Sequence, residues 1–231
     1  MASVGGHSFR LDYGETHLNI RSDVVCRSAA LDGLVRHYSE LVGYINRDPL
    51  FKASYEPVAV QQDAPEIVRL MADAAKACGV GPMAAVAGAF SELVGGRIVS
   101  AGGKDVLVEN GGDIFLMASS EKVVSIHSGP SMLSDLFALR VEPSDSPCGI
   151  CTSSASVGPS ISLGKADSVT CVADSPALAD AAATAVGNLV LSDDLRPAFG
   201  KASSIAGLRG VVVIVGESFG AWGRLPDIIR R

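Results

Sequence analysis

A short β-prone run that leads directly into an alanine-rich helix is the feature that most constrains the fold of this chain. Small and β-branched residues alternate over 168–173, which is typical of a strand. Asp174-Ser175-Pro176 then supplies an N-cap and a proline at the first helical position. Alanine and leucine dominate the stretch that follows, as far as Leu191, so its helix propensity is high. The sequence therefore predicts a buried strand feeding a helix that begins at Pro176.

The predicted helix contains one charged residue, Asp180. Thr184 follows one helical turn later, so the two side chains share a face. Two oxygen ligands at this spacing suit a hard cation such as Mg²⁺, which proteins usually hold with one or two carboxylates beside substrate phosphates and waters. In a purely structural alternative, Asp180 complements the helix dipole and Thr184 hydrogen-bonds to the backbone. The spacing leaves both interpretations open.

Composition argues against several classes of function. A net charge of −6 over 231 residues, with no cluster of five or more basic residues, argues against a nucleic-acid-binding surface. The N-terminus has no secretory signal pattern, and the longest apolar stretches are too short or too interrupted to cross a membrane. We therefore expect a cytoplasmic protein. The five cysteines do not form the pattern of a disulfide framework, so we expect reduced thiols.

Hydrophobic periodicity predicts an α+β chain. Strand clusters and helices alternate without a repeated β-α spacing, which argues against a doubly wound sheet. The continuous apolar run 211–215 predicts a central strand buried on both faces. The other expected elements are a hairpin over 9–25, helices over 28–47, 64–78 and 83–94, a connector with an extended piece at 57–60, an antiparallel meander over 105–141, a helical piece near 202 and a closing strand over 216–222.

Two glycine-rich segments have both a structural and a functional interpretation. Asn110-Gly-Gly-Asp113 is a strong hairpin-turn signal, because asparagine and glycine tolerate a positive φ. Its exposed backbone and Asp113 could also approach a ligand closely. Gly79-Val-Gly-Pro82 precedes a helix whose first N–H groups could bind a phosphate. Its structural alternative is a plain turn between two helices.

A segment rich in hydroxyls surrounds Cys148 and Cys151. Their spacing raises a redox or zinc interpretation, but the sequence has no second cysteine pair and no amphipathic helix after them. A nucleophilic Cys151 would need a histidine brought close by the fold, and the candidates are His7, His17, His37 and His127. The hydroxyl run Thr152-Ser153-Ser154 fits hydrogen bonding to a phosphate or a flavin ring better than nucleophilic chemistry.

Five motifs together resemble the ApbE-like FAD:protein FMN transferases, in the same order along the chain. The resemblance covers roughly Gly79 to Val190. The whole chain is more closely similar to a short branch of that superfamily, which implies a single ApbE-like, T-fold-like domain over 1–231 with mostly antiparallel sheets packed with helices. The motifs are Met83–Glu92 (MAAVAGAFSE), Asn110–Ile114 (NGGDI), Ile150–Ser154 (ICTSS), Ala166–Thr170 (ADSVT) and Ala179–Thr184 (ADAAAT).

The resemblance implies site residues. In the transferases the helical Asp-x-x-x-Thr motif binds magnesium beside the FAD pyrophosphate, together with a backbone carbonyl from the glycine-alanine helix. By this resemblance Asp180 and Thr184 are expected metal ligands, with the carbonyl near Ala84. The Gly-Gly-Asp and Thr-Ser segments line the flavin site in that family. The expected cofactor-binding residues are Gly111, Gly112, Asp113, Thr152 and Ser153.

The chain departs from the transferase pattern in two places. Ala87 stands where the transferases have a lysine, and Ser160–Asp167 lacks the histidine and proline of their His-x-x-Asp-Pro segment. We therefore expect a cleft for a phosphorylated flavin-like or pterin-like ligand with Mg²⁺, and FMN transfer is the less expected version. The alternative is a non-enzymatic binding or scaffold protein with a degenerate cleft. The long amphipathic helix and the apolar closing strand leave room for a homodimer.

Overall fold

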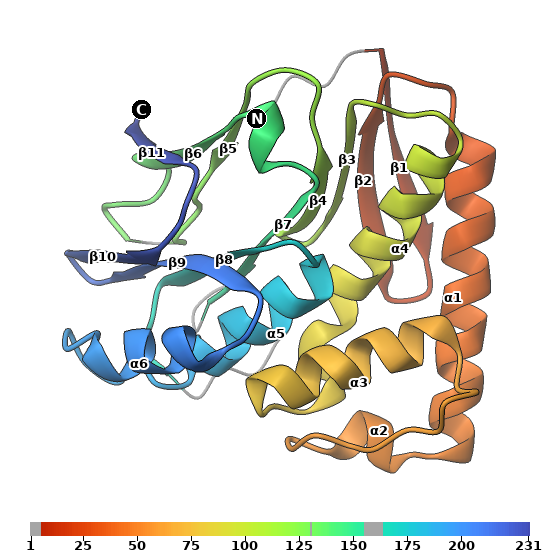
Figure 1. Cartoon of the computed structure of the whole chain (residues 1–231), viewed down its shortest axis with the longest axis horizontal. Coiled ribbons are helices and arrows are strands. Elements are labelled where there is room, and N and C mark those ends of the chain that lie inside the picture. Colours follow the sequence, from red (N-terminus) through yellow and green to blue (C-terminus); the bar gives the residue numbers. More distant parts are fainter. Residues whose placement is uncertain (1–5, 130, 155–163) are drawn as a thin grey trace.

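The computed structural model describes residues 6–129, 131–154 and 164–231. Helices pack on one face of a large antiparallel sheet, and a small antiparallel sheet packs on its other face (Figure 1). The expected α+β class is confirmed. Across the large sheet the strand order is β1 (His7–Tyr13), β2 (Thr16–Ser22), β3 (Val106–Asn110), β4 (Asp113–Met117), β7 (Cys148–Ser153), β8 (Ser168–Ala173), β9 (Leu208–Val215) and β10 (Ser218–Gly223).

The small sheet corrects the expected meander over 105–141. The first two of its strands join the large sheet, and the last two belong to the small one. Alternating apolar residues predict a strand, but its pairing partner depends on contacts that are distant in the sequence. The strands β7 and β11 were not expected as strands at all. The small sheet has the order β11 (Asp227–Arg230), β6 (Phe137–Val141) and β5 (Lys122–Ser125).

The helices lie close to their predicted positions, with differences in α5, in the connector after α1 and at the end of α4. α5 begins at Pro176 as expected and ends at Gly187, before Leu191. The first part of the connector is a helical turn, α2, and its piece 57–60 forms no strand. The helices are α1 (Arg27–Arg47), α2 (Leu50–Ala53), α3 (Glu66–Cys78), α4 (Val86–Ser100), α5 (Pro176–Gly187) and α6 (Arg196–Ser204), with 3₁₀ turns η1 (Pro82–Ala85) before α4 and η2 (Pro143–Asp145) before β7.

α4 continues to Ser100, beyond its expected end at Val94. The pair Gly95-Gly96 lowers helix propensity, which is why the sequence predicts an end there. A side chain at Gly95 would collide with the ring of Phe115 on β4. The glycine therefore allows α4 to lie close against the sheet, and this packing outweighs the propensity cost.

β9 is buried on both faces, as expected, but it is not central. It lies second from the edge of the large sheet, next to β10. Val211 and Val213 belong to the core on the helix side, whereas Val212 and Ile214 belong to the core shared with the small sheet. Two covering layers explain the continuous apolar run better than a central position does.

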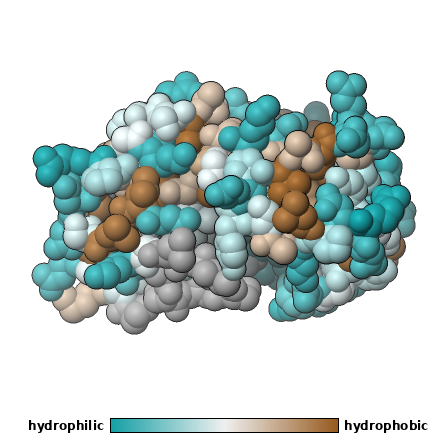
Figure 2. Space-filling model, turned by 90° about the horizontal axis from the view of Figure 1, so that it is seen from below, coloured by the Kyte–Doolittle hydropathy of each residue, from teal (hydrophilic) through white to brown (hydrophobic). Residues whose placement is uncertain are grey.

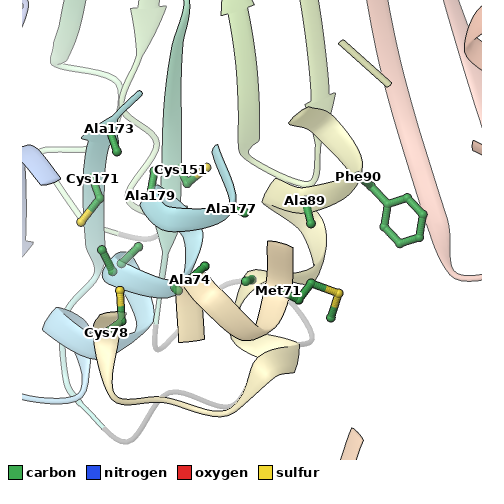
Figure 3. Close-up of a cluster of buried hydrophobic side chains, with 14 of the residues drawn as sticks. Met71, Ala74, Cys78, Ala89, Phe90, Cys151, Cys171, Ala173, Ala177 and Ala179 are labelled. Atoms are coloured by element: carbon green, nitrogen blue, oxygen red, sulfur yellow. The ribbon is translucent and has the colours of Figure 1, made fainter. Parts of the chain in front are cut away.

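Small side chains allow α5 to approach the strands beneath it (Figure 3). Ala177 and Ala179 of α5 lie over Cys151 of β7 and Cys171 of β8, all of them buried in the helix-side core. A side chain at Gly149 would collide with the backbone of α5 at Pro176. The alanine-rich sequence of α5 thus permits close helix-sheet packing.

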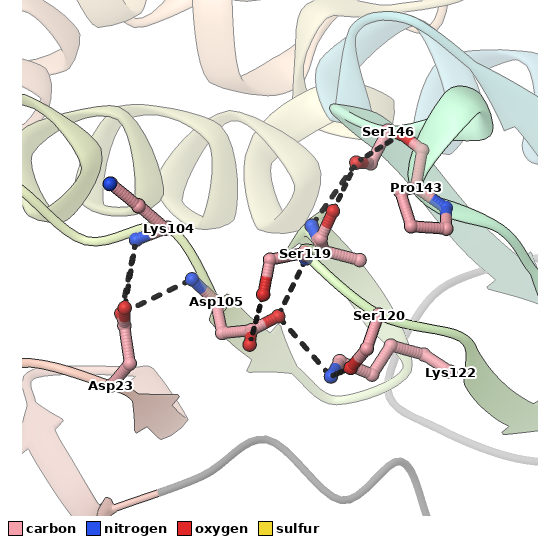
Figure 4. Close-up of polar contacts among 9 residues, drawn as sticks. Asp23, Lys104, Asp105, Ser119, Ser120, Lys122, Pro143 and Ser146 are labelled. Carbon is pink, nitrogen blue, oxygen red and sulfur yellow. Dashed lines mark hydrogen bonds and ion pairs between the residues drawn. The ribbon is translucent and has the colours of Figure 1, made fainter.

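A polar network connects the start of β3 with the turn before β5 (Figure 4). The Asp105 carboxylate accepts hydrogen bonds from the Ser119 backbone N–H (2.8 Å) and hydroxyl (2.6 Å), and the Lys122 Nζ lies 3.2 Å from its Oδ1. The Lys122 side chain is only 2% exposed and also donates to the Ser120 hydroxyl. Asp23 accepts from the backbone N–H of Asp105. Lys122 is thus a buried cation whose charge is compensated by one carboxylate.

Pro82–Ser100 is long and apolar enough for a membrane span by composition alone. In the structure this segment packs against α1, α3, α5 and the large sheet, as a core helix does. Figure 2 views the molecule from the end formed by α2, α3, α5 and α6, where hydrophobic areas are separated by hydrophilic residues. Leu50 of α2 and Leu191, in the loop between α5 and α6, are exposed apolar side chains.

Candidate functional site

α4 and α5 pack side by side, and each carries a carboxylate that caps the N-terminus of the other. The Asp180 Oδ2 on α5 accepts a hydrogen bond from the Gly88 N–H in the first turn of α4 (2.9 Å). In return, the Glu92 Oε2 on α4 accepts from the Ser175 hydroxyl (2.6 Å) and the Ala177 N–H (3.1 Å) at the start of α5. Carboxylates at these positions satisfy N–H groups that have no partner within their own helix. The two caps fix the relative position of the helices.

The structure agrees in part with the structural interpretation of Asp180. The carboxylate does complement a helix N-terminus, but it is that of α4 and not of its own helix. α5 has its own cap, because the Ser175 hydroxyl accepts from the Leu178 N–H. Thr184 is half-buried, and among the described residues its hydroxyl makes no hydrogen bond to the backbone. One part of the structural interpretation, a backbone bond from Thr184, is therefore not observed.

Glu92→Ala is expected to lower the free energy of unfolding by about 1–2 kcal/mol, the usual cost of losing a helix cap. The substitution leaves the Ala177 N–H and the Ser175 hydroxyl without their acceptor in a partly buried place. Urea denaturation measures the effect. Glu217→Ala, at an exposed residue in the turn between β9 and β10, is the matched control and should change little. Equal stability of the two variants would contradict the capping role.

Asp113 is a buried carboxylate at the start of β4. Its side chain is 8% exposed, and its Oδ1 has no hydrogen-bond partner among the described residues. Burial raises the pKa of Asp113 to about 7, although interactions with the Cys151 side chain and the Thr152 backbone act in the opposite direction. The Ser91 hydroxyl on α4 donates to the Asp113 backbone carbonyl (2.7 Å). A buried carboxylate oxygen without a partner is costly, so its presence points to a ligand site.

Asp180 lies near enough to Asp113 for their charges to interact. Burial raises the pKa of Asp180 well above its usual range, and the charge of Asp113 raises it further. Two carboxylates that destabilise each other in this way fit a divalent cation placed between or beside them. Ala84 lies on η1, which packs against α5. Among the described residues, no three His, Cys, Asp or Glu side chains converge on one point, so a cation here would also need hydroxyl and carbonyl oxygens.

The hairpin prediction for Asn110–Asp113 is confirmed. Gly111 and Gly112 form the turn between β3 and β4 with φ angles of 65° and 111°, which other residues rarely adopt. A Cβ atom at either glycine would meet nothing within 4 Å, so the space beside this turn is open. Close approach of a ligand to this backbone is therefore sterically allowed.

Thr152 and Ser153 end β7, the strand that pairs with β4. Both are half-buried, and the Thr152 hydroxyl lies 2.9 Å from that of Thr170 on β8. The Thr152 N–H interacts with the Asp113 carboxylate, which brings these two expected site residues together. Of the departing segment Ser160–Asp167, the first four residues lie outside the described residues.

The two cysteines of β7 lie on opposite faces of the large sheet. Cys148 belongs to the core shared with the small sheet, and Cys151 to the helix-side core. Burial raises the pKa of the Cys148 thiol to about 12 and that of Cys151 well above its usual value. This geometry gives no support to a redox pair or a zinc site. Three of the candidate histidines for a nucleophilic Cys151 pair elsewhere: His17 with Asp12, His37 with Glu40 and His127 with Asp135.

The phosphate seat considered at Gly79–Pro82 is not supported either. A side chain at Gly81 would collide with the backbone carbonyl of Ser54, so the loop packs against the connector after α2. In the first turn of α4, the Gly88 N–H already donates to Asp180. The segment therefore acts as the helix-helix turn of the structural alternative.

Comparison with known proteins identifies the family. A family described as "AbpE bacteria" matches residues 1–215. The chain belongs to this family. Among its relatives, the UPF0280 protein of Methanocella arvoryzae is 42% identical over 94% of this chain and 88% of the relative. The UPF0280 protein of Methanosarcina acetivorans is also 42% identical, over 94% of this chain and 86% of the relative.

Solved structures confirm the ApbE-like fold at low sequence identity. The Pseudomonas stutzeri flavinyl transferase ApbE in its apo form is 14% identical, with a TM-score of 0.61 over 96% of this chain and 95% of that chain. The Vibrio cholerae flavin transferase ApbE is 14% identical, with a TM-score of 0.54 over 94% of this chain and 96% of that chain. These likenesses establish the fold.

Glu92 and Cys151 form part of this site. The sequence patterns gave Glu92 no role, and they considered Cys151 only as a nucleophile or as one of a redox or zinc pair. Glu92 is the one acidic residue in an apolar helix, which is the same signal that singled out Asp180. Cys151 donates a hydrogen bond to the Pro176 carbonyl and interacts with the Asp113 carboxylate. Its contribution depends on strand pairing between β4 and β7, which the sequence does not reveal.

Proposed function

We propose that the chain binds a phosphorylated, flavin-like ligand together with a divalent cation where α4, α5 and the β3–β4 turn meet. The supporting observation is the buried Asp113 carboxylate, whose Oδ1 has no partner in the described part of the chain and whose charge acts on Asp180. Such a pair of carboxylates is costly without a counter-charge, and a cation would supply it. The donor set of carboxylate, hydroxyl and carbonyl oxygens suits Mg²⁺.

In this proposal Asp180, Thr184 and the Ala84 carbonyl hold the cation. When bound, the cation neutralises negative charge on the phosphates of the ligand. The Asp180 carboxylate is held toward α4 by the Gly88 N–H, so its orientation is set before a ligand arrives. Gly111 and Gly112 offer backbone without side-chain obstruction to the ligand.

Asp113, Thr152 and Ser153 complete the proposed ligand-binding surface. Asp113 presents its Oδ1 to a donor on the ligand or on a cation-bound water, and the two hydroxyl-bearing residues can both donate and accept. A pterin-like ligand would use the same surface, because flavin and pterin rings both carry amide-like edges that form hydrogen bonds with carboxylate and hydroxyl groups.

FMN transfer itself is the less favoured version of this function. At Ala87, where the transferases carry a lysine, the backbone carbonyl accepts from the Asn110 side chain, and the Ala87 side chain supplies no charge. A preorganised charged donor is typically worth roughly 3 kcal/mol in a transition state. An assay with FAD, Mg²⁺ and an acceptor protein domain is therefore expected to give no covalent flavin above background. Labelling that depends on Asp180 would overturn this expectation.

Isothermal titration with Mg²⁺ and FAD tests the binding site. Asp180→Asn keeps an oxygen acceptor for the Gly88 N–H but removes the negative charge, so we expect at least about tenfold weaker binding of Mg²⁺ in the presence of FAD. Asp193→Asn, an exposed residue in the loop before α6, is the control and should bind like the parent. Equal binding by all three proteins would remove the cation assignment. Absence of binding in the parent would favour the alternative, a scaffold protein with a degenerate cleft.

A further inference from the structure

A groove of about 590 Å³ lies away from the proposed cation site, between the two sheets. Its floor is the face of β1, β2 and β3 that points away from the helices, and its opposite wall is β5 with the C-terminal residue Arg231. Apolar side chains in it include Leu107, Ile114 and Val124. The volume is within the usual range for ligand-binding sites, and none of the expected cofactor or metal residues lines the groove.

β5 is the end strand of the small sheet, so one of its edges is open on the groove side. The Ile126 N–H donates to the Phe137 carbonyl, and Val124 lies opposite Leu139 in the same register. Hydrogen-bonding residues alternate along an antiparallel strand, so Val124 bonds toward β6 and Ser125 directs its N–H and C=O toward the open edge. No strand of the described chain pairs with this edge.

Arginines outnumber carboxylates in the lining of the groove, although the chain as a whole is acidic. Arg10, Arg21 and Arg231 come from three separate segments and line one groove of a protein whose net charge is −6. Two carboxylates, Glu109 and Asp135, also line it, and Asp135 pairs with His127. Arg10 forms an ion pair with Asp12 (2.8 Å), and because both side chains are exposed this pair is weak. The Arg231 guanidinium donates to the neutral Ser125 hydroxyl (2.6 Å), so this contact leaves its charge uncompensated.

We propose that this groove binds an extended acidic peptide segment of a partner protein, which adds to the small sheet as a strand beside β5. The backbone of the peptide pairs with the open edge at Val123 and Ser125. Its alternate side chains then point either to the apolar floor at Leu107 and Ile114 or to the arginines. Charge complementarity selects an acidic segment over a basic one. This function is independent of the proposed cation site.

Fluorescence anisotropy with a labelled peptide of alternating valine and glutamate tests the proposal. The parent is expected to bind it saturably, and a peptide of alternating valine and lysine is expected not to bind. Ser125→Pro removes the edge N–H without removing a bond to β6, and we expect at least about tenfold weaker binding from it. Ser125→Ala keeps that N–H and is the matched control, with binding within about threefold of the parent.

The charge contribution is tested separately with Arg231→Gln, which should weaken binding and reduce its salt dependence. Circular dichroism verifies that each variant is folded. The proposal is wrong if the acidic peptide fails to bind the parent, if the lysine peptide binds equally well, or if Ser125→Pro binds like Ser125→Ala. A dimer in light scattering that Ser125→Pro dissociates would also overturn it, because a second copy of the chain would then occupy the edge.

Discussion

Asp105→Asn is expected to lower the free energy of unfolding by about 3–5 kcal/mol, the cost of leaving a buried charge without its partner. Lys122 is 2% exposed, and within the network of Figure 4 Asp105 is its one carboxylate partner. Asparagine preserves the shape of the side chain and can still accept a hydrogen bond from Ser119. The decrease in the free energy of unfolding therefore reports mainly the unpaired charge of Lys122. Urea denaturation at neutral pH measures the effect.

Lys122→Met in the Asp105→Asn background is the control that assigns the cause. It removes the unpaired ammonium while keeping an apolar side chain of similar length, so most of the lost stability should return. Asp23→Asn, which affects an exposed carboxylate bonded to backbone N–H groups of the same turn, should cost much less. No recovery in the double variant would show that the hydrogen bonds to Ser119, and not the charge of Lys122, account for the loss.

The ion pair between Asp105 and Lys122 is expected to stabilise the protein less at acidic pH. Burial alone would raise the pKa of Asp105, but hydrogen bonds from Ser119 and Lys122 outweigh it and lower that pKa. A lowered folded pKa means that the ionised pair stabilises the protein above the unfolded pKa of the carboxyl. That contribution is lost as the pH falls through the folded pKa. The difference between the parent and Asp105→Asn should therefore shrink on acidification.

Local sequence signals predict most of the helices and strands. The features that they do not predict depend on contacts between residues distant in the sequence. The N-cap Ser175 and the proline after it fixed the start of α5, because capping depends on neighbouring residues alone. The sequence predicts that α4 ends just before Gly95, but close packing of this glycine against Phe115 outweighs helix propensity and the helix continues. Membership of the two sheets could not be predicted, since the short apolar runs in β3 and β5 predict strands but do not specify their pairing partners.

In the candidate site too, the sequence predicts single residues but not the contacts between them. Asp113 and Asp180 were identifiable because each is an acidic residue in a segment that is otherwise apolar or glycine-rich. Their mutual approach, and the reciprocal caps through Glu92 and Gly88, arise only when α4 packs on α5. The chemistry of single residues was thus readable from the sequence, whereas the coupling between them required the fold.

Without a divalent cation, the protein is expected to lose stability as the pH rises from about 4 to about 7. Burial raises the pKa of Asp113 from 3.8 to about 7, with Glu109 adding to the effect. The folded chain then binds more protons than the unfolded chain in this interval, so unfolding becomes easier as the pH rises. The pKa of Asp180 is shifted in the same direction. The shift of Asp113 alone corresponds to up to roughly 4 kcal/mol.

Urea denaturation in the presence of a chelator, near pH 5 and near pH 8, measures this loss. Asp113→Asn should remove most of it, whereas the exposed Asp193→Asn should retain it. Saturating Mg²⁺ should restore stability mainly at the higher pH, because a bound cation favours the ionised carboxylates that burial disfavours. A metal-free protein with the same stability at both pH values would contradict the buried-carboxylate account. Recovery by Mg²⁺ at the higher pH in the parent but not in Asp180→Asn would connect that cost directly to the proposed cation site.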